Sequence, residues 1–117
     1  MKPHEIARHQ PDPRHADIVL YLAPSLLWFK GHFAVQPLLP GVAQLDWAMH
    51  YATTLLAPDF RFHSIKNVKF QAPLLPEAHV TLSLAWQPER ETLSFSYLRH
   101  AGDERLTASS GKIRLCR

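Results

Sequence analysis

The one strong helix candidate in the chain is the segment Pro40-Gly-Val-Ala-Gln-Leu-Asp-Trp-Ala-Met-His-Tyr-Ala-Thr-Thr-Leu-Leu-Ala57, and we expect the rest of the fold to be arranged around it. Pro40 suits the first helical turn, and Pro58 ends the run. Apolar residues at helical spacing predict a stripe that faces the core: Val42, Leu45, Met49, Ala52 and Leu56. The other faces carry few polar groups, so we expect the helix to lie inside the protein rather than on its surface.

The segments on either side of this helix are typical of strands. One strand is expected before it, at residues 17–22, and four after it, at residues 60–72, 79–86, 92–98 and 106–115. Residues 1–15 are polar and rich in Pro and His, and they are interpreted as an arm or a short irregular helix. The order predicts a single α+β domain over residues 1–117, in which an antiparallel sheet wraps around one long central helix.

Composition narrows the classes of function. With 46% hydrophobic and 20% charged residues, the 117-residue chain is globular rather than disordered. Its net charge of +3 comes from scattered Lys and Arg, a pattern that does not favour nucleic acid as a partner. Neither a signal peptide nor a membrane span is expected, because the apolar runs are short. The single Cys116 excludes an internal disulfide and predicts a cytoplasmic protein.

Three positions near the helix start suggest acid–base chemistry. Asp46 is the only charged side chain of the helix, and at about 100° per residue it lies on the margin of the predicted core stripe. A carboxyl group there should be partly desolvated and suited to act as an acid, or else it pairs with a neighbouring Arg or Lys. His32 lies in the preceding loop, and Gly41 lies where the free N–H groups of a helix start can polarise a carbonyl. This set suits proton abstraction beside a carbonyl with departure of a β-hydroxyl group.

The segment Gly31-His-Phe-Ala-Val-Gln-Pro-Leu-Leu-Pro-Gly-Val-Ala-Gln-Leu-Asp46 resembles the signature of the hotdog-fold β-hydroxyacyl-(acyl carrier protein) dehydratases. That signature has Gly-His-Phe, a Pro five residues after the His, then Pro-Gly-Val and an acidic residue fourteen after the His, and this chain meets each spacing. A second block, Val68-Lys-Phe-Gln-Ala-Pro73, is also similar. The resemblance extends over residues 17–116 and implies a hotdog fold.

This resemblance also implies a reaction: dehydration of β-hydroxyacyl thioesters to trans-α,β-enoyl thioesters, in fatty acid biosynthesis or in polyene- or polyketide-type pathways such as the aryl polyene branch. His32 would remove the α-proton, Asp46 would protonate the departing hydroxyl group, and the Gly41 N–H would hold the thioester oxygen. An apolar tunnel for the acyl chain would lie near Phe33, Leu38 and Val42. Neither a cofactor nor a metal is implied.

The partners implied by the resemblance are an acyl carrier protein that brings the substrate, in preference to coenzyme A, and a second hotdog chain. In the family, the His and the acid face each other across a dimer interface. The second chain would be another copy of this one, or a homologous dehydratase in a heterodimer.

Some positions depart from the family pattern and leave two alternatives open. Ala34 stands where Pro is common, Trp47 where a small residue is usual, and His50 where Gln is frequent. One alternative is a hotdog thioesterase, in which Asp46 activates water or acts as the nucleophile and His32 is incidental. The other is a non-catalytic acyl-binding subunit that supports a catalytic homologue in a heterodimer.

Overall fold

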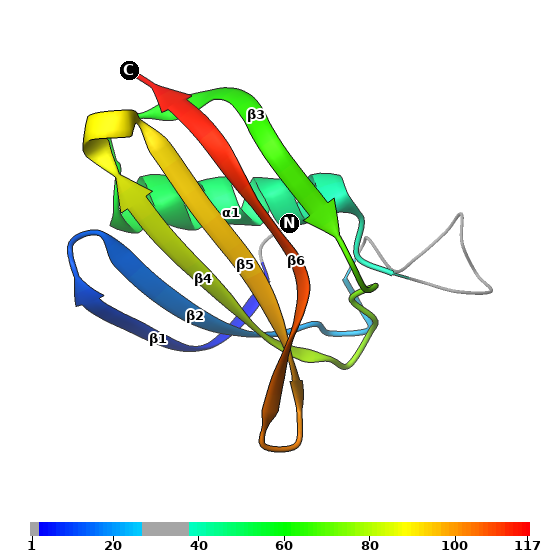
Figure 1. Cartoon of the computed structure of the whole chain (residues 1–117). Helices are drawn as coiled ribbons and strands as arrows, with labels where there is room; N and C mark the ends of the chain where they lie inside the picture. Colours follow the sequence, from blue (N-terminus) through cyan, green and yellow to red (C-terminus); the bar gives the residue numbers. More distant parts are fainter. Residues whose placement is uncertain (1–2, 27–37) are drawn as a thin grey trace.

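The computed structural model describes residues 3–26 and 38–117, which form one antiparallel sheet and one long helix. The strands follow one another across the sheet in the order β1-β2-β4-β5-β6-β3, and the helix lies across one face of it (Figure 1). In chain order the elements are β1 (His4–Asp12), β2 (His15–Tyr21), α1 (Gly41–Leu55), β3 (Arg61–Phe70), β4 (His79–Gln87), the short 3-10 helix η2 (Pro88–Arg90), β5 (Thr92–Ala101) and β6 (Glu104–Cys116).

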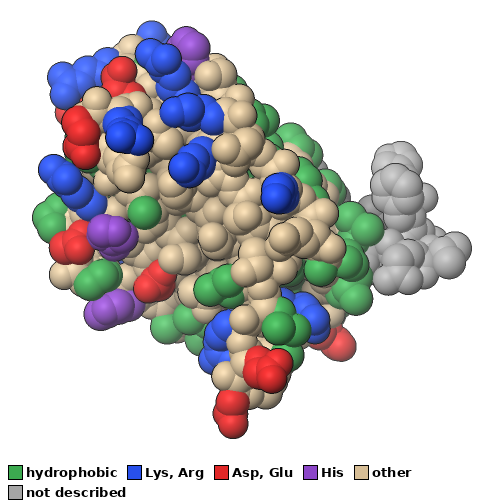
Figure 2. Space-filling view, viewed as in Figure 1, with side chains coloured by type: hydrophobic (Ala, Val, Ile, Leu, Met, Phe, Trp, Pro, Cys, Tyr) green, Lys and Arg blue, Asp and Glu red, His purple; other side chains and the backbone are tan. Residues whose placement is uncertain are grey.

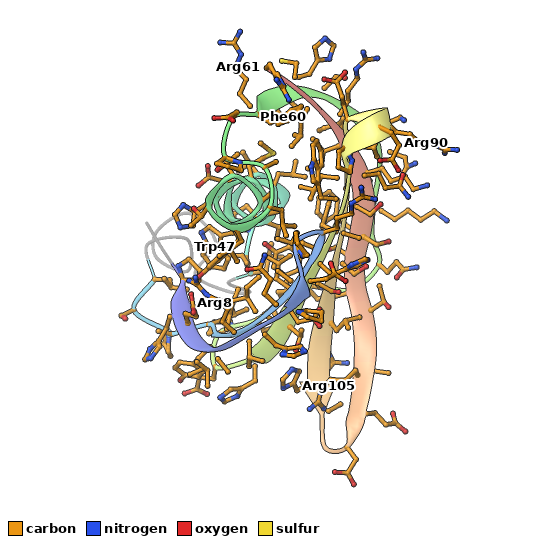
Figure 3. The ribbon with its side chains drawn as sticks, turned by 90° about the vertical axis from the view of Figure 1, so that its left-hand side faces the viewer. Arg8, Trp47, Phe60, Arg61, Arg90 and Arg105 are labelled. Atoms are coloured by element: carbon orange, nitrogen blue, oxygen red, sulfur yellow. The ribbon has the colours of Figure 1, made fainter. Side chains whose placement is uncertain are left out.

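The core lies between α1 and the face of the sheet that it covers, as the end-on view of the helix in Figure 3 shows. Along the central strands β4 and β5, every second side chain points into this core. The side chains between them point to the opposite face of the sheet. From the sheet come Ile18, Leu20, Val80, Leu82, Leu84, Leu93, Phe95, Tyr97, Ile113 and Leu115, and from the helix come Ala43, Trp47, Ala48, Tyr51 and Ala52. The small alanines let the helix approach the sheet closely, while Trp47 fills the space between them.

Much of the predicted architecture is confirmed. The five expected strands correspond to β2, β3, β4, β5 and β6, and the predicted helix is α1, which ends before Pro58. The α+β arrangement of a sheet around one helix is therefore correct. Of the helices in the described ranges, none has the length and apolar character needed to cross a membrane.

The interpretation of residues 1–15 as an arm or an irregular helix is wrong, because His4–Asp12 form strand β1. Its backbone pairs with β2, and its side chains reach the helix. The Tyr51 hydroxyl donates to Glu5 at 3.1 Å, and the Gln10 amide donates to the Leu55 carbonyl at 3.1 Å. Burial, followed by the hydrogen bond to Glu5, raises the pKa of Tyr51 to about 12, so the phenol remains a donor at neutral pH. Pairing and polar contacts, rather than an apolar face, hold this strand in place.

The face of α1 predicted to point into the core is also wrong in part. Val42 is 66% exposed, and Leu45 and Met49 are only partly buried. The side that packs on the sheet carries Ala43, Trp47, Ala48, Tyr51 and Ala52 instead. Of the predicted stripe, Ala52 and Leu56 are buried as expected. The stripe that contains Val42 therefore lies on the outside of the chain described here.

Candidate active site

The start of α1 presents backbone donors to its surroundings. Pro40 precedes the helix in an extended conformation, and its carbonyl accepts hydrogen bonds from the N–H groups of Ala43 and Gln44, both at 3.1 Å. The N–H groups of Gly41 and Val42 have no acceptor among the described residues. Because the positive end of the helix dipole adds to their partial charge, these two amides can stabilise an oxygen that gains negative charge.

A hollow of about 230 Å³ lies beside these amides, between the helix start and the end of β3. Leu38 and Gly41 line it from one side and Phe70 from the other, and Leu38 is 40% exposed. A side chain at Gly41 would place its Cβ atom 2.6 Å from Cζ of Phe70. Glycine therefore permits the close approach of the Phe70 ring to the backbone at the helix start.

Asp46 lies one turn further along α1, in a second hollow of about 340 Å³. The other residues that line this hollow are apolar: Val42, Leu45, Met49 and Phe62. The carboxyl group is exposed and not partly buried as the sequence predicted, because the stripe on whose margin it lies faces outward. Among the described residues Asp46 forms no ion pair, so the alternative of a structural Arg or Lys partner finds no support there.

The apolar surroundings of Asp46 continue onto the edge of the sheet. Among residues 3–26 and 38–117, strand β3 pairs on one side only, with β6, and its other edge has no strand partner. Phe62 and Ile65 on this strand are both 48% exposed, and Phe62 lines the Asp46 hollow together with the outward stripe of the helix. An unpaired strand edge beside exposed apolar side chains is a surface that a second protein chain can cover. We call these residues — Val42, Leu45, Met49, Phe62 and Ile65 — the edge surface.

A buried polar cluster that the sequence analysis missed anchors the helix start to the sheet. Gln44 is 3% exposed, and its side chain joins the Leu39 carbonyl to the Ser109 hydroxyl of β6. The Tyr97 hydroxyl of β5 donates to the backbone carbonyl of Gln44 at 2.7 Å. The available signal was an amide side chain within an almost wholly apolar helix, two positions away from Asp46 and thus on another face.

The structure thus brings Leu38 and Gly41 to one hollow at the helix start, and Val42 and Asp46 to a second hollow along the same helix. His32 and Phe33 lie outside the described residues. Within the described ranges no group of three or more His, Cys, Asp or Glu side chains is placed to hold a metal ion.

Comparison with solved structures gives close matches over the whole chain. A chain of the dehydratase heterocomplex ApeI:P from Xenorhabdus doucetiae is 56% identical, with 100% of both chains covered and a TM-score of 0.93. An uncharacterized protein from Erwinia carotovora subsp. atroseptica is 51% identical over 99% of this chain and 97% of that one, also with a TM-score of 0.93. The dehydratase domain of the polyketide protein PpsC from Mycobacterium tuberculosis is 16% identical at a TM-score of 0.77, a likeness of fold. The hotdog fold expected from the sequence is confirmed.

Among curated proteins, the 3-hydroxyacyl-[acyl-carrier-protein] dehydratase FabZ of Tolumonas auensis is 34% identical over 77 residues. This match covers 57% of the chain and 50% of the relative, so the chain spans about half the length of the curated relatives it matches. The family model described as ApeI-like, ApeI dehydratase, matches residues 8–112 and so includes both hollows and the strands that frame them. The chain belongs to the ApeI-like dehydratase family.

Proposed function

We propose that this chain dehydrates β-hydroxyacyl thioesters to trans-α,β-enoyl thioesters in fatty acid biosynthesis or in a polyene- or polyketide-type pathway. The observation that carries the proposal is the placement of Asp46 in an apolar hollow one helical turn from the N–H groups of Gly41 and Val42. An acid and a pair of oxyanion donors are thereby available on one helix, at the spacing of the dehydratase signature. Family membership supports the same reaction class.

In the proposed reaction the Gly41 N–H binds the thioester oxygen and stabilises the negative charge that develops there. The His32 imidazole takes the α-proton, and the electron pair of that C–H bond forms the new double bond as the Cβ–O bond breaks. Asp46, in its acid form, gives its proton to the departing hydroxyl group, which leaves as water. Only protons move between protein and substrate, so these steps need neither a metal nor a redox cofactor.

The substrate-binding part of the proposal assigns the acyl chain to the apolar walls around Asp46. Val42 and Phe62 line this hollow, and Leu38 lines the separate hollow at Gly41. We place Phe33 on the same tunnel because of its position in the signature. Since Cys116 is a free thiol and the chain has no other cysteine, we place the reaction in the cytoplasm.

A second hotdog chain is proposed to cover the edge surface, so that two sheets join at β3 and two helices pack side by side. Asp46 would then be enclosed by the partner and would face the partner's copy of the loop that carries His32. The partner is another copy of this chain or a homologous dehydratase. The relative from Xenorhabdus doucetiae, which is part of a dehydratase heterocomplex, supports the second arrangement. Exposure of Val42 and Phe62 in the single chain supports either one.

The proposed carrier of the substrate is an acyl carrier protein, an acidic partner that suits a basic surface. Figure 2 shows Lys and Arg side chains on the face of the sheet turned away from the helix. Lys69 and Lys112 line a shallow depression of about 570 Å³ there, between β3, β5 and β6. Lys69 immediately precedes Phe70 on β3, and the Phe70 ring lies against Gly41 on the opposite face of the strand.

Reversal of charge at this depression should weaken carrier binding without altering the chemistry. In the double variant Lys69→Glu/Lys112→Glu we expect KM for a carrier-bound substrate to rise about tenfold at low salt, because steering by opposite charges is lost. KM for the same acyl group on free pantetheine should stay the same. Arg105→Glu, on the exposed β5–β6 hairpin, is the matched control and should leave both values unchanged. An equal rise for both substrates would contradict a carrier-docking role.

The proposed function is tested by incubating the chain with β-hydroxyacyl thioesters and following enoyl absorbance and free thiol together. We expect enoyl product without thiol release. Thiol release without enoyl product would identify a thioesterase and refute the dehydratase. If the chain alone forms neither product, and activity is seen only after a homologous dehydratase is added, the result would favour a non-catalytic subunit. The relative that belongs to a heterocomplex is compatible with such a role.

A further inference from the structure

The Gln44 cluster is a buried, hydrogen-bonded polar group between the helix start and the sheet. The Gln44 Nε2 atom donates to the Leu39 carbonyl at 3.1 Å, and its Oε1 atom accepts from the Ser109 hydroxyl at 2.6 Å. Ser109 is fully buried on β6. Because both ends of the amide are bonded in a site closed to water, loss of either contact leaves an unpaired buried group, which is costly.

The residues that precede the helix are hydrogen-bonded on two sides. The Leu39 N–H donates to the Leu74 carbonyl at 2.8 Å, while the Leu39 carbonyl accepts from Gln44. Leu39 is itself buried and lies two residues before Gly41. The peptide units around Leu39 are thus tied both to the helix that follows and to the segment between β3 and β4.

A third tie fixes the helix to the middle of the sheet. The Tyr97 hydroxyl donates to the backbone carbonyl of Gln44, in addition to the bonds within the helix. Burial raises the pKa of Tyr97, so its hydroxyl keeps its proton and stays a donor. Together, Ser109 on β6 and Tyr97 on β5 set the height and rotation of the first helical turn over the sheet.

We propose that Gln44 is a positioning residue, which aims the Gly41 N–H at the thioester oxygen by locking the Leu39 peptide and the first turn of α1 to β5 and β6. This inference rests on the proposed function. Gln44 faces the sheet, on the opposite side of α1 from the Asp46 hollow. It lines the hollow beside Gly41, but both ends of its amide are bonded to Leu39 and Ser109, so it acts through Gly41. The Gly41 amide meets more negative charge in the transition state than in the bound thioester, so its orientation affects kcat more than KM.

The test is Gln44→Met, which keeps the length of the side chain and removes both hydrogen bonds. In the purified full chain we expect kcat for the β-hydroxyacyl thioester to fall about 10- to 100-fold, with KM within about twofold. We also expect the Leu39 amide to exchange its hydrogen with deuterium about tenfold faster, because the carbonyl of the same residue loses its hydrogen bond and the segment is held less firmly. An unchanged kcat would overturn the inference, and so would a rise in KM alone.

Thr92→Val is the matched control, because Thr92 is equally buried at 3% exposed and its hydroxyl donates to the Arg90 carbonyl at the far end of β5. We expect it to lower the melting temperature while leaving kcat and Leu39 exchange unchanged. A fall in kcat equal to that of Gln44→Met would show a general effect of stability and refute positioning.

A milder pair of variants tests the same inference in case Gln44→Met does not fold. Ser109→Ala removes only the donor to Gln44, and we expect about a three- to tenfold fall in kcat, which Ser109→Thr should restore because it keeps the hydroxyl. Failure of the threonine to restore kcat would count against the inference. If the wild-type chain forms no enoyl product, the proposed function fails. Hydrogen exchange at Leu39 in Gln44→Met then tests the positioning role by itself, and an unchanged exchange rate would overturn that role.

Discussion

Replacement of Asp46 by Asn should reduce enoyl formation about a thousandfold, the largest effect on catalysis that we expect from a single described residue. The carboxamide has almost the same shape as the carboxyl group, so the hollow formed with Val42, Met49 and Phe62 keeps its walls. It cannot give up a proton to the departing hydroxyl group at neutral pH, so the Cβ–O bond must break without an acid. The measurement is the initial rate of enoyl absorbance at saturating substrate.

The control for Asp46→Asn is Asp59→Asn, another exposed aspartate that follows α1. Because both side chains are exposed, each change should alter the free energy of unfolding by about 0.5 kcal/mol or less. Only Asp46→Asn should lose turnover. If Asp46→Asn retained more than about a tenth of the wild-type rate, Asp46 would not be the acid.

Replacement of Phe62 by Glu should weaken pairing with the second hotdog chain about 30- to 1000-fold, as loss of a central interface aromatic commonly does. Phe62 is 48% exposed at the unpaired edge of β3 and borders the outward stripe of α1. A carboxylate there would have to be desolvated under the partner, close to Asp46. The measurement is molar mass by light scattering over a dilution series, since Phe62 also lines the acid's hollow and turnover would mix the two effects.

The matched control is Ile6→Glu, a charge placed on the opposite edge strand, β1, where Ile6 is 52% exposed. It should leave the molar mass unchanged. If both variants keep the mass of the wild type, or if the wild type remains at 13.4 kDa even with a homologous dehydratase present, the edge surface is not the pairing surface.

The fold was largely predictable because most of its elements carry a local pattern. Apolar and polar residues alternate along β4 and β5, because one side of the sheet faces the helix and the other faces solvent. Pro40 and Pro58 likewise mark the limits of α1, because proline is tolerated at a helix start and not in its interior. Strand β1 carries no such pattern: all nine of its residues are exposed, and pairing with β2 makes it a strand.

The orientation of the helix could not be read from its own residues. A helix that is apolar on nearly every side has no polar face to mark the solvent, so periodicity alone cannot separate the side that packs on the sheet from the side at the edge surface. The small residues Ala43 and Ala48 fit against the strands, whereas Val42 faces outward. The same reversal exposes Asp46. Spacing in the signature selected Asp46 and Gly41 as candidate site residues, but only the folded chain reveals that Gln44 ties the start of their helix to the sheet.

The most direct test of a dehydratase site shared between two chains is complementation between His32→Ala and Asp46→Asn, each inactive by itself. After the two variants are unfolded together and refolded at equal concentrations, half of the dimers should be mixed, and each mixed dimer should regain one of its two sites. We expect recovery of about a quarter of the wild-type rate of enoyl formation. No recovery, in a sample where native mass spectrometry detects the mixed dimer, would contradict it.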